Sequence, residues 1–186
     1  MKRLFDLFFS ITSCILLIIP MLTIAIAIKI TSNGPVLYWS NRVGRNNIIF
    51  SMPKFRTMKI DTPSVATHML DNPDSFLTPL GRLLRATSLD EIPQLYSVIR
   101  GEMSVVGPRP ALFNQNDLIA MRNKKGIDKL MPGITGWAQI NGRDELEIPS
   151  KVIFDEEYLL RKSFWFDIKI ISLTALKVFK GSNVSH

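Results

Sequence analysis

A long apolar segment near the N-terminus constrains this chain more than any other feature. Residues 7–28 contain no charged side chain, and as one straight helix rising about 1.5 Å per residue they would measure roughly 33 Å. That length matches the hydrocarbon core of a bilayer. Pro20 lies near the middle of the segment, where it removes a backbone hydrogen bond and kinks or breaks a helix. The segment therefore either crosses a membrane or folds back around a break.

Three arrangements of this segment compete. A cleaved signal peptide is indicated by the basic start and by the small residues at 25–27, but the apolar run is longer than such peptides usually have. The second arrangement is a spanning helix that is kinked at Pro20. The third is a re-entrant helix–break–helix, whose arms of about 13 and 9 residues, roughly 20 and 14 Å, are each too short to cross the bilayer.

Basic residues on both sides of the apolar segment favour the re-entrant arrangement. They are Lys2, Arg3, Lys29, Arg42 and Arg45. Because basic residues mark the cytoplasmic side of membrane segments, placing both ends in the cytoplasm removes the conflict that a spanning helix creates. We therefore expect a re-entrant membrane helix over residues 1–32 that breaks at Pro20.

The chain is basic outside this segment. Its 186 residues include 23 Lys and Arg against 16 Asp and Glu, which gives a formal net charge of +7. Such a surface favours anionic partners, namely nucleic acid, anionic lipid or phosphorylated substrates. The single cysteine, Cys14, cannot form an internal disulfide and fits a reducing compartment. The length allows one further domain, which we place at 33–186.

Patterns along 33–186 predict a mainly α domain with a small β element, an α+β fold. Two short strands are expected at 36–39 and 48–52, around a polar loop. Residues 61–79 are rich in turn formers and predict a mobile surface loop, and the glycines of 130–143 predict a loop that lines a site. Helices are expected at 80–85, 90–100, 115–124, 151–160 and 164–180.

The expected helix at 164–180 combines aromatic and branched aliphatic residues with three lysines. This pattern is typical either of a core helix or of an interfacial helix that lies on lipid with its lysines toward the headgroups. Because the apolar segment already anchors the chain, we favour the interfacial helix.

Two adjacent carboxylates, Asp90 and Glu91, lie at an expected helix start. The purely structural interpretation is a capping box formed by Ser88 and Glu91. Pro93 argues against a cap at Ser88, because its ring would collide with the preceding turn of an α-helix, and this moves the expected cap to 90–92. Both carboxylates would then lie at the positive end of a helix dipole, which favours their ionised form. An ionised aspartate can attack phosphorus, and its neighbour can hold Mg²⁺.

An arginine between two prolines, Pro108-Arg109-Pro110, follows the acid pair. The residue before a proline is kept out of the helical region, so Arg109 is held extended. Gly107 allows another group to approach closely. A pre-organised guanidinium suits bidentate recognition of phosphate. The alternative is a rigid surface turn with a solvated arginine.

Other charged residues have weaker signals. Asp155 shares an expected helix with Glu156 and Glu157, which is typical of a solvated acidic face. A set of basic residues either surrounds the acid pair or lies on a solvated or lipid-facing surface: Lys54, Arg56, Arg82 and Arg85. The sequence contains no P-loop, no GxGxxG and no cysteine or histidine pair at metal-ligand spacing.

Four motifs in this order resemble the bacterial sugar transferase family: KFRTM (54–58), SLDEIPQL (88–95), GEMSVVGPRP (101–110) and PGITGWAQINGR (132–143). More narrowly, nearly the whole chain resembles the small monotopic phosphoglycosyl transferases that start glycan assembly on a polyprenol phosphate. The resemblance implies a re-entrant helix and a cytosolic catalytic domain at the cytoplasmic face of the bacterial inner membrane. Relatives often have a serine before the membrane-breaking proline, where its hydroxyl can satisfy the carbonyl that the proline leaves free. Here Ile19 precedes Pro20, and we expect Thr23 to substitute for that serine.

The resemblance also implies a reaction. A UDP-sugar, expected to carry an N-acetylated amino sugar, binds with Mg²⁺. Asp90 attacks its β-phosphorus, UMP leaves, and undecaprenyl phosphate accepts the sugar phosphate from the covalent aspartyl intermediate. Glu91 matches the Mg²⁺ ligand and Arg109 the nucleotide-binding arginine. The remaining expected site residues are Lys54, Arg85, Pro108 and Pro110 for nucleotide or phosphate, and Asp155 as a further polar position.

Two other functions were weighed against this reaction. A non-catalytic membrane scaffold for glycan assembly predicts that loss of Asp90 and Glu91 leaves function intact. A membrane-tethered nucleic-acid binder predicts salt-dependent binding, but the sequence contains no recognised nucleic-acid module. Membrane lipid is therefore an expected partner and nucleic acid is not, while the sequence gives no indication of an oligomeric state.

Overall fold

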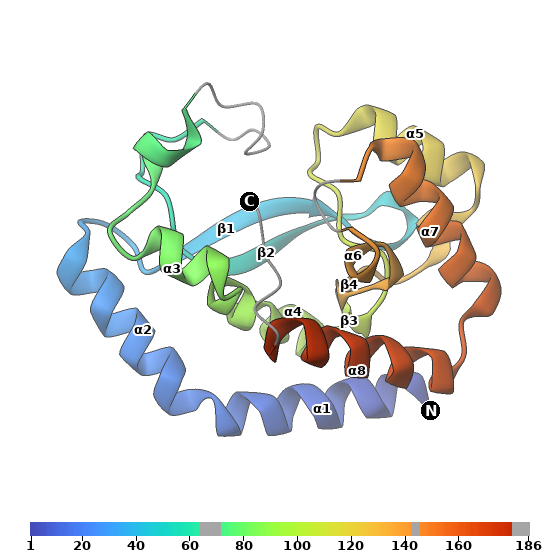
Figure 1. Ribbon diagram of the computed structural model, residues 1–186, viewed down its shortest axis with the longest axis horizontal. Coiled ribbons are helices and arrows are strands. Elements are labelled where there is room, and N and C mark those ends of the chain that lie inside the picture. Colours follow the sequence, from blue (N-terminus) through green and yellow to red (C-terminus); the bar gives the residue numbers. More distant parts are fainter. Residues whose placement is uncertain (64–71, 143–145, 180–186) are drawn as a thin grey trace.

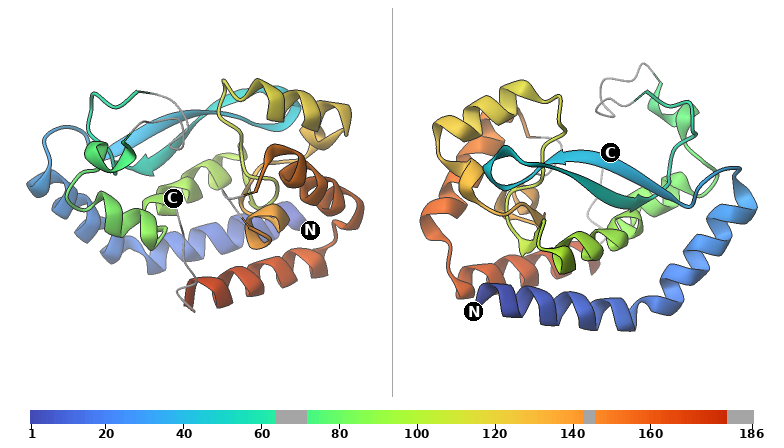
Figure 2. Two further views of the ribbon diagram at one scale, coloured as in Figure 1. Left: turned by 45° about the horizontal axis from the view of Figure 1, so that its top comes forward. Right: turned by 180° about the vertical axis from the view of Figure 1, so that it is seen from behind.

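A bent pair of N-terminal helices runs along the edge of the molecule, and the remaining elements lie on the inner side of the bend (Figures 1 and 2). The computed structural model describes residues 1–63, 72–142 and 146–179. The strands are β1 (Leu37–Val43), β2 (Ile49–Phe55), β3 (Ser104–Val106) and β4 (Gly133–Thr135). The α-helices are α1 (Lys2–Leu16), α2 (Ile18–Thr31), α3 (Gly81–Ala86), α4 (Leu95–Arg100), α5 (Asn116–Lys124), α6 (Trp137–Ile140), α7 (Ile148–Arg161) and α8 (Phe164–Phe179). The 3-10 helices are η1 (Arg45–Asn47), η3 (Pro73–Phe76), η4 (Leu89–Gln94) and η5 (Ile127–Lys129).

The helices α1 and α2 meet at Leu17 with a bend of 60°. The break was expected at Pro20 but lies three residues earlier. Pro20 lies in the first turn of α2, where a proline is tolerated, and it has no N–H to bond the carbonyl of Leu16. Thr23 donates to the carbonyl of Ile19 at 3.0 Å. It therefore does not satisfy the carbonyl that the proline leaves free.

Much of the apolar surface of this helix pair is exposed. None of the described helices alone is long and apolar enough to cross a membrane, whereas the bent pair meets that test by length and composition. The exposed side chains include Leu4, Phe8, Ile15, Leu16, Ile19, Leu22, Ile26 and Ile30. An exposed apolar surface of this extent marks a contact with lipid or with another protein.

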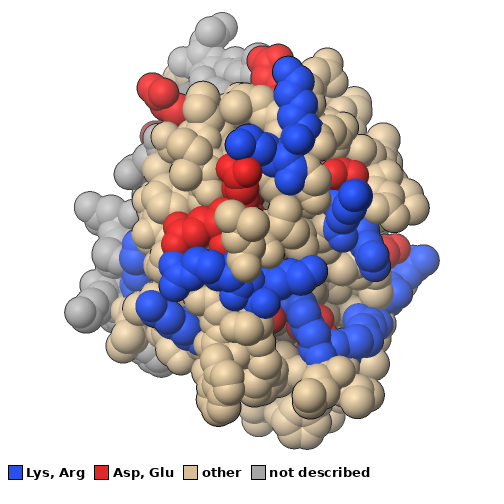
Figure 3. All heavy atoms as spheres, turned by 90° about the vertical axis from the view of Figure 1, so that its right-hand side faces the viewer, with Lys and Arg blue, Asp and Glu red and all other residues tan. Residues whose placement is uncertain are grey.

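The helix α8 lies beside α1 along the same edge (Figures 1 and 2), and the rings of Phe5 and Phe164 meet edge to face at 5.5 Å. One face of α8 is buried at Phe166 and Ile170, while Trp165 on another face is 78% exposed. The helix therefore packs into the core with one face and exposes an apolar side chain on another. On the face of the molecule seen in Figure 3, Lys and Arg side chains form a band above a lower edge that shows no charged side chain.

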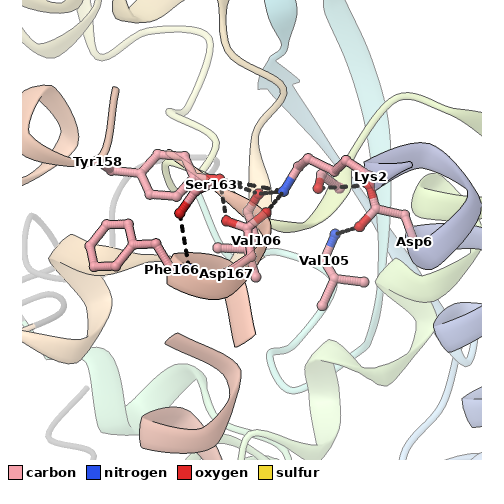
Figure 4. Close-up of polar contacts among 9 residues, drawn as sticks. Lys2, Asp6, Val105, Val106, Tyr158, Ser163, Phe166 and Asp167 are labelled. Atoms are coloured by element: carbon pink, nitrogen blue, oxygen red, sulfur yellow. Dashed lines mark hydrogen bonds and ion pairs between the residues drawn. The ribbon is translucent and has the colours of Figure 1, made fainter. Parts of the chain in front are cut away.

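Three charged side chains tie α1 to the rest of the domain. Arg3 donates to the carbonyls of Val98 and Ile99 in α4. The other two are Asp6 and Lys2 (Figure 4). Asp6 is only 4% exposed, and its carboxylate accepts hydrogen bonds from the Ser104 hydroxyl at 2.9 Å and the Val105 amide at 3.1 Å. The ammonium group of Lys2 lies 2.5 Å from the carboxylate of Asp167 in α8. A buried carboxylate is tolerated when it is hydrogen-bonded in this way, so α1 is part of the fold and not a loose appendage.

The Lys2–Asp167 pair belongs to a larger network (Figure 4). Lys2 also donates to the carbonyl of Val106 at 3.0 Å. Tyr158 of α7 donates to the other carboxylate oxygen of Asp167 at 2.7 Å. Burial, followed by the nearby charge of Asp167, raises the pKa of Tyr158 far above its ordinary value. The phenol therefore stays a donor at physiological pH, and α1, α7, α8 and β3 are held together at one point.

The hairpin β1–β2 confirms the two expected strands and extends both of them. It is antiparallel, with Tyr38 opposite Lys54 and Val43 opposite Ile49. The turn between the strands is made by η1, in which Asn46 has a left-handed φ of 55°. Because the second strand continues to Phe55, Lys54 lies inside a strand and not in the loop that follows it.

The glycine-rich segment 130–143 was expected to be a loop, and that prediction is wrong. It forms β4, which pairs in parallel with β3, and then α6. A Cβ on Gly133 would lie 2.1 Å from the amide nitrogen of Gly107, and one on Gly136 would lie 2.2 Å from the carbonyl oxygen of Gly107. The glycines are thus needed for two backbones to touch. Arg143, at the end of the segment, lies outside the described residues.

The other expected elements are largely confirmed. The helices expected at 80–85, 115–124, 151–160 and 164–180 are present as α3, α5, α7 and α8, with residue 180 outside the described range. Over the residues that the structure describes, the fold is α+β, mostly helical with two small sheets. The loop expected at 61–79 includes residues 64–71, which are not described; its later part contains η3.

A test of the α1 attachment compares two leucine substitutions on the same helix. Asp6→Leu leaves the Val105 amide buried without an acceptor, which costs about 1–3 kcal/mol. Thr12→Leu places the same side chain at an exposed position of α1. In urea unfolding in one detergent, we expect Asp6→Leu to lower the midpoint and Thr12→Leu to leave it within error. Equal midpoints for the two variants would contradict the role given to Asp6.

Candidate active site

The acid pair lies in η4, directly after a left-handed residue. Ser88 has a φ of 57° and precedes the 3-10 turn that carries Asp90 and Glu91. The prediction that the cap moves to 90–92 is therefore wrong, because the chain is not α-helical here. A 3-10 turn uses i to i+3 hydrogen bonds and so accommodates Pro93 where an α-helix would not. The capping box is not formed either, since no side-chain hydrogen bond caps η4.

Two cations share one oxygen of Glu91. The Nζ of Lys54, from β2, lies 2.8 Å from Glu91 Oε1, and Nη2 of Arg109 lies 2.9 Å from the same atom. Lys54 Nζ is also 3.9 Å from Oδ2 of Asp90. Arg85, in the last turn of α3, lies close enough for its charge to lower the pKa of Asp90. The structure thus brings together five of the residues expected at the site, from four separate segments.

Asp90 is buried, with 6% of its surface exposed. Within the described part of the chain, its Oδ1 has no hydrogen-bond partner. Burial raises the pKa of Asp90, the charge of Lys54 opposes this, and the charge of Glu91 adds to it. The expectation that the helix end favours the ionised carboxylate is therefore wrong for this structure, because loss of water outweighs the neighbouring cations. An acid of this kind is poised to gain a ligand.

Burial acts on the lysine as well. The pKa of Lys54 is lowered, first by burial, although the charge of Glu91 opposes the shift. Arg109 and Arg42 lower it further by repulsion. The site therefore combines a carboxylate and an ammonium group that are both shielded from water. A phosphate bound beside Lys54 would reduce the repulsion between Lys54 and the neighbouring arginines.

The acid pair fits a magnesium ion only together with a phosphorylated ligand. Across residues 1–63, 72–142 and 146–179, no group of three or more His, Cys, Asp or Glu side chains could hold a metal ion. Mg²⁺ is commonly bound by one or two carboxylates plus phosphate oxygens and waters. The carboxylate of Glu91, beside Asp90 in η4, supplies such a partial ligand set.

The Pro-Arg-Pro loop follows β3 and is held at its carbonyl groups. Pro108 accepts a hydrogen bond from the amide of Gly133 at 2.9 Å. Pro110 accepts one from Arg42 at 3.2 Å. The two prolines therefore lie beside Arg109 and hold its backbone in place through their hydrogen-bonded carbonyls. The parallel pairing of β3 with β4 positions the loop.

The other charged residues of the expected site lie elsewhere. Arg56 is 5% exposed and donates to Ser32 and to the carbonyl of Asn33, so it closes the end of α2. Arg82 makes an exposed pair with Asp74 at 2.8 Å. Their charges serve the fold and the surface, not the acid pair.

Asp155 is buried and does not lie on a solvated acidic face. It is 1% exposed, and Arg122 of α5 reaches its Oδ2 through Nε at 3.0 Å and Nη2 at 2.6 Å. Burial raises the pKa of Asp155 and the charge of Arg122 opposes the shift. Sequence reasoning missed both Arg122 and Arg42 at the site. Arg122 reads as an ordinary last-turn cation of a helix, and no local pattern distinguishes it from the lysines that follow.

A family model described as bacterial sugar transferase matches residues 1–181. The chain belongs to this family. The undecaprenyl-phosphate glucose phosphotransferase of Komagataeibacter xylinus is 43% identical over 93% of the chain and 35% of its own length. The UDP-glucose:undecaprenyl-phosphate glucose-1-phosphate transferase of Escherichia coli (strain K12) is 43% identical over 97% of the chain and 40% of its own length.

A shorter relative is similar over almost its whole length. The uncharacterized sugar transferase EpsL of Bacillus subtilis (strain 168) is 38% identical over all of the chain and 91% of its own length. The chain therefore spans two fifths or less of the first two relatives and nearly all of the third. The match to the family therefore extends over nearly the whole chain and not over one segment of it.

Neutralising substitutions of Asp90 and Glu91 should change the stability of the folded protein in opposite directions. Because burial raises the folded-state pKa of Asp90, its charged form costs stability at neutral pH, and Asp90→Asn removes that cost. Glu91→Gln instead removes the partner of two cations. We expect the unfolding temperature, measured at neutral pH without Mg²⁺ or nucleotide, to rise for Asp90→Asn and to fall for Glu91→Gln, by roughly 2–4 °C per kcal/mol. The exposed Asp117→Asn is the control. The reverse order would show that the neighbouring cations outweigh burial.

Proposed function

We propose that this protein transfers a sugar 1-phosphate from a UDP-sugar to undecaprenyl phosphate and releases UMP, with Asp90 as the nucleophile. The observation that carries the proposal is the buried Oδ1 of Asp90, which has no partner in the described chain and lies among Lys54, Arg85 and Arg109. The family supports the reaction class, and the names of two relatives specify glucose and undecaprenyl phosphate.

The first step joins Asp90 to the donor. Its Oδ1 attacks the β-phosphorus, a bond forms between them, and the bond from phosphorus to the oxygen bridging the two phosphates breaks. The electron pair of that bond leaves with UMP, so no proton has to move through Asp90. Lys54 lies within 3.9 Å of the same carboxylate, where it can balance charge that develops on the phosphate oxygens.

Arg109 recognises the diphosphate in this scheme. Its side chain is 24% exposed and its Nη2 lies 2.9 Å from Glu91, and the fork of N–H donors on a guanidinium suits a phosphate. We assign the Mg²⁺ to Glu91 together with the phosphate oxygens of the donor. When bound, the ion neutralises the diphosphate and makes UMP a better leaving group.

The second step releases the sugar phosphate to lipid. A phosphate oxygen of undecaprenyl phosphate attacks the phosphorus, the aspartyl–phosphorus bond breaks, and Asp90 is regenerated as a carboxylate. A covalent intermediate lets the soluble nucleotide leave before the lipid arrives, so one small site can serve both substrates.

The acceptor explains why the site belongs at a membrane. We propose that α1, α2 and the exposed face of α8 lie in the cytoplasmic leaflet of the bacterial inner membrane, with the rest of the domain in the cytosol. The basic band above the uncharged edge (Figure 3) then meets anionic headgroups. The phosphate of the lipid acceptor lies at the same depth.

The donor sugar is a separate question from the reaction. The resemblance to small family members predicts an N-acetylated amino sugar, whereas the names of the relatives specify glucose or galactose. A screen of UMP release against UDP-glucose, UDP-galactose and UDP-N-acetylated sugars distinguishes them.

Asp90→Asn tests the nucleophile. We expect it to reduce UMP release by at least about 10³-fold, including in the half-reaction without lipid acceptor, because the attacking oxygen is lost. Intact-protein mass spectrometry of wild type with donor alone should show the added sugar phosphate. Asp117→Asn, an exposed acid of α5, should behave as wild type. Wild-type UMP release by Asp90→Asn would reject the assignment.

Pro20→Ala tests the membrane arrangement. Alanine restores the N–H that the Leu16 carbonyl lacks, so α1 and α2 should straighten toward one spanning helix. The parent protein for this test carries Cys14→Ser and an introduced cysteine near one terminus or the other. In the parent, both introduced cysteines should react with a thiol reagent supplied from the cytoplasmic side of the membrane. In Pro20→Ala, labelling of one terminus should fall. Termini on opposite sides in the parent would disprove the re-entrant arrangement.

A further inference from the structure

The guanidinium of Arg122 connects a buried acid to the site loop. Two of its nitrogens contact Oδ2 of Asp155, as described above, and its Nη1 donates to the carbonyl of Arg109 at 2.8 Å. The side chains of Arg122 and Asp155 are 12% and 2% exposed. A fixed, water-excluded ion pair of this kind orients whatever else its guanidinium binds.

The loop that carries Arg109 needs such donors. Its prolines, Pro108 and Pro110, have no backbone N–H, so the loop is held mainly through its carbonyls. All three carbonyls accept hydrogen bonds, from Gly133, Arg122 and Arg42 in turn. The middle one belongs to Arg109 itself, whose side chain contacts Glu91. The contact from Arg122 is therefore the one that acts on the backbone of the site arginine.

Apolar packing does not replace these hydrogen bonds. A partly open pocket of about 30 Å³ lies against the loop, with Pro108, Ala111 and Arg122 in its lining. On this side the loop is therefore not covered by close-packed side chains. A loop without close packing on one side can shift unless polar contacts hold it.

We propose that Asp155 and Arg122 are positioning residues that hold the Arg109 guanidinium for the donor diphosphate, without either residue touching the substrate. The inference rests on the proposed function. It changes the expected role of Asp155 from a polar residue of the site to the anchor of its support. Arginine is required because a lysine cannot contact a carboxylate and a carbonyl through a rigid fork.

A double-mutant cycle tests the proposal. We expect Arg122→Met to lower kcat/KM for the UDP-sugar by about 10²-fold, because a shift of about 1 Å in a positioning group has that effect. The loss should appear mainly in KM for the donor, with the KM for undecaprenyl phosphate changed by less than about twofold. In an Arg109→Met background, Arg122→Met should have almost no further effect, because its action passes through Arg109.

The chain offers a matched control between the same two helices. Lys125, which directly follows α5, and Glu156 of α7 form an ion pair at 3.0 Å. Lys125→Met should leave both KM values and kcat within about twofold of wild type, which separates helix docking from loop positioning. Arg122→Lys should recover only part of the loss.

The outcomes separate the two hypotheses. If wild type releases no UMP from any donor, the proposed function fails. If wild type is active and the losses from Arg122→Met and Arg109→Met simply multiply, the positioning role is overturned. Should Arg122→Met not fold, Asp155→Asn makes the same test, because it keeps Arg122 and weakens only its anchor. An unchanged donor KM in folded Asp155→Asn would then reject the proposal.

Discussion

One carboxylate oxygen, Oε1 of Glu91, organises the centre of this molecule. It binds Lys54 from a hairpin strand and Arg109 from a proline-flanked loop, although these groups lie 37 and 18 residues away along the chain. The contact is largely buried, so its strength depends on every neighbouring element excluding water. The hairpin, η4 and the β3–β4 contact can all be understood as the framework that brings these three charges together.

The same burial that strengthens this contact makes the charged form of the neighbouring Asp90 less stable. Asp90 lies beside Glu91, and loss of water raises its pKa despite the cations around it. A folded protein keeps such a group when a ligand later satisfies it. The buried carboxylate therefore costs stability relative to an apolar group, and its Oδ1 is an atom whose hydrogen bonding is left incomplete within the described structure.

The sequence predicted most of what short patterns encode. The hairpin, four of the helices, the bent apolar element and the convergence of Lys54, Asp90, Glu91 and Arg109 all follow from periodicity, turn formers and family motifs. The failures have physical causes. The segment 130–143 was taken for a loop because glycines weaken strands, whereas here they allow two backbones to touch. The role of Arg122 depends on Asp155, 33 residues further along the chain, so no local pattern could reveal it.

The attachment of α1 has a consequence for the order in which the protein is made. The atoms that satisfy Asp6 and Lys2 belong to residues synthesised 98 and 165 positions later. Until those residues have been synthesised, both charges need water, so the first turns of α1 cannot yet be buried against the domain. The contacts that hold α1 are therefore complete only after α8 has been synthesised, so the first and last helices of the chain reach their final arrangement together.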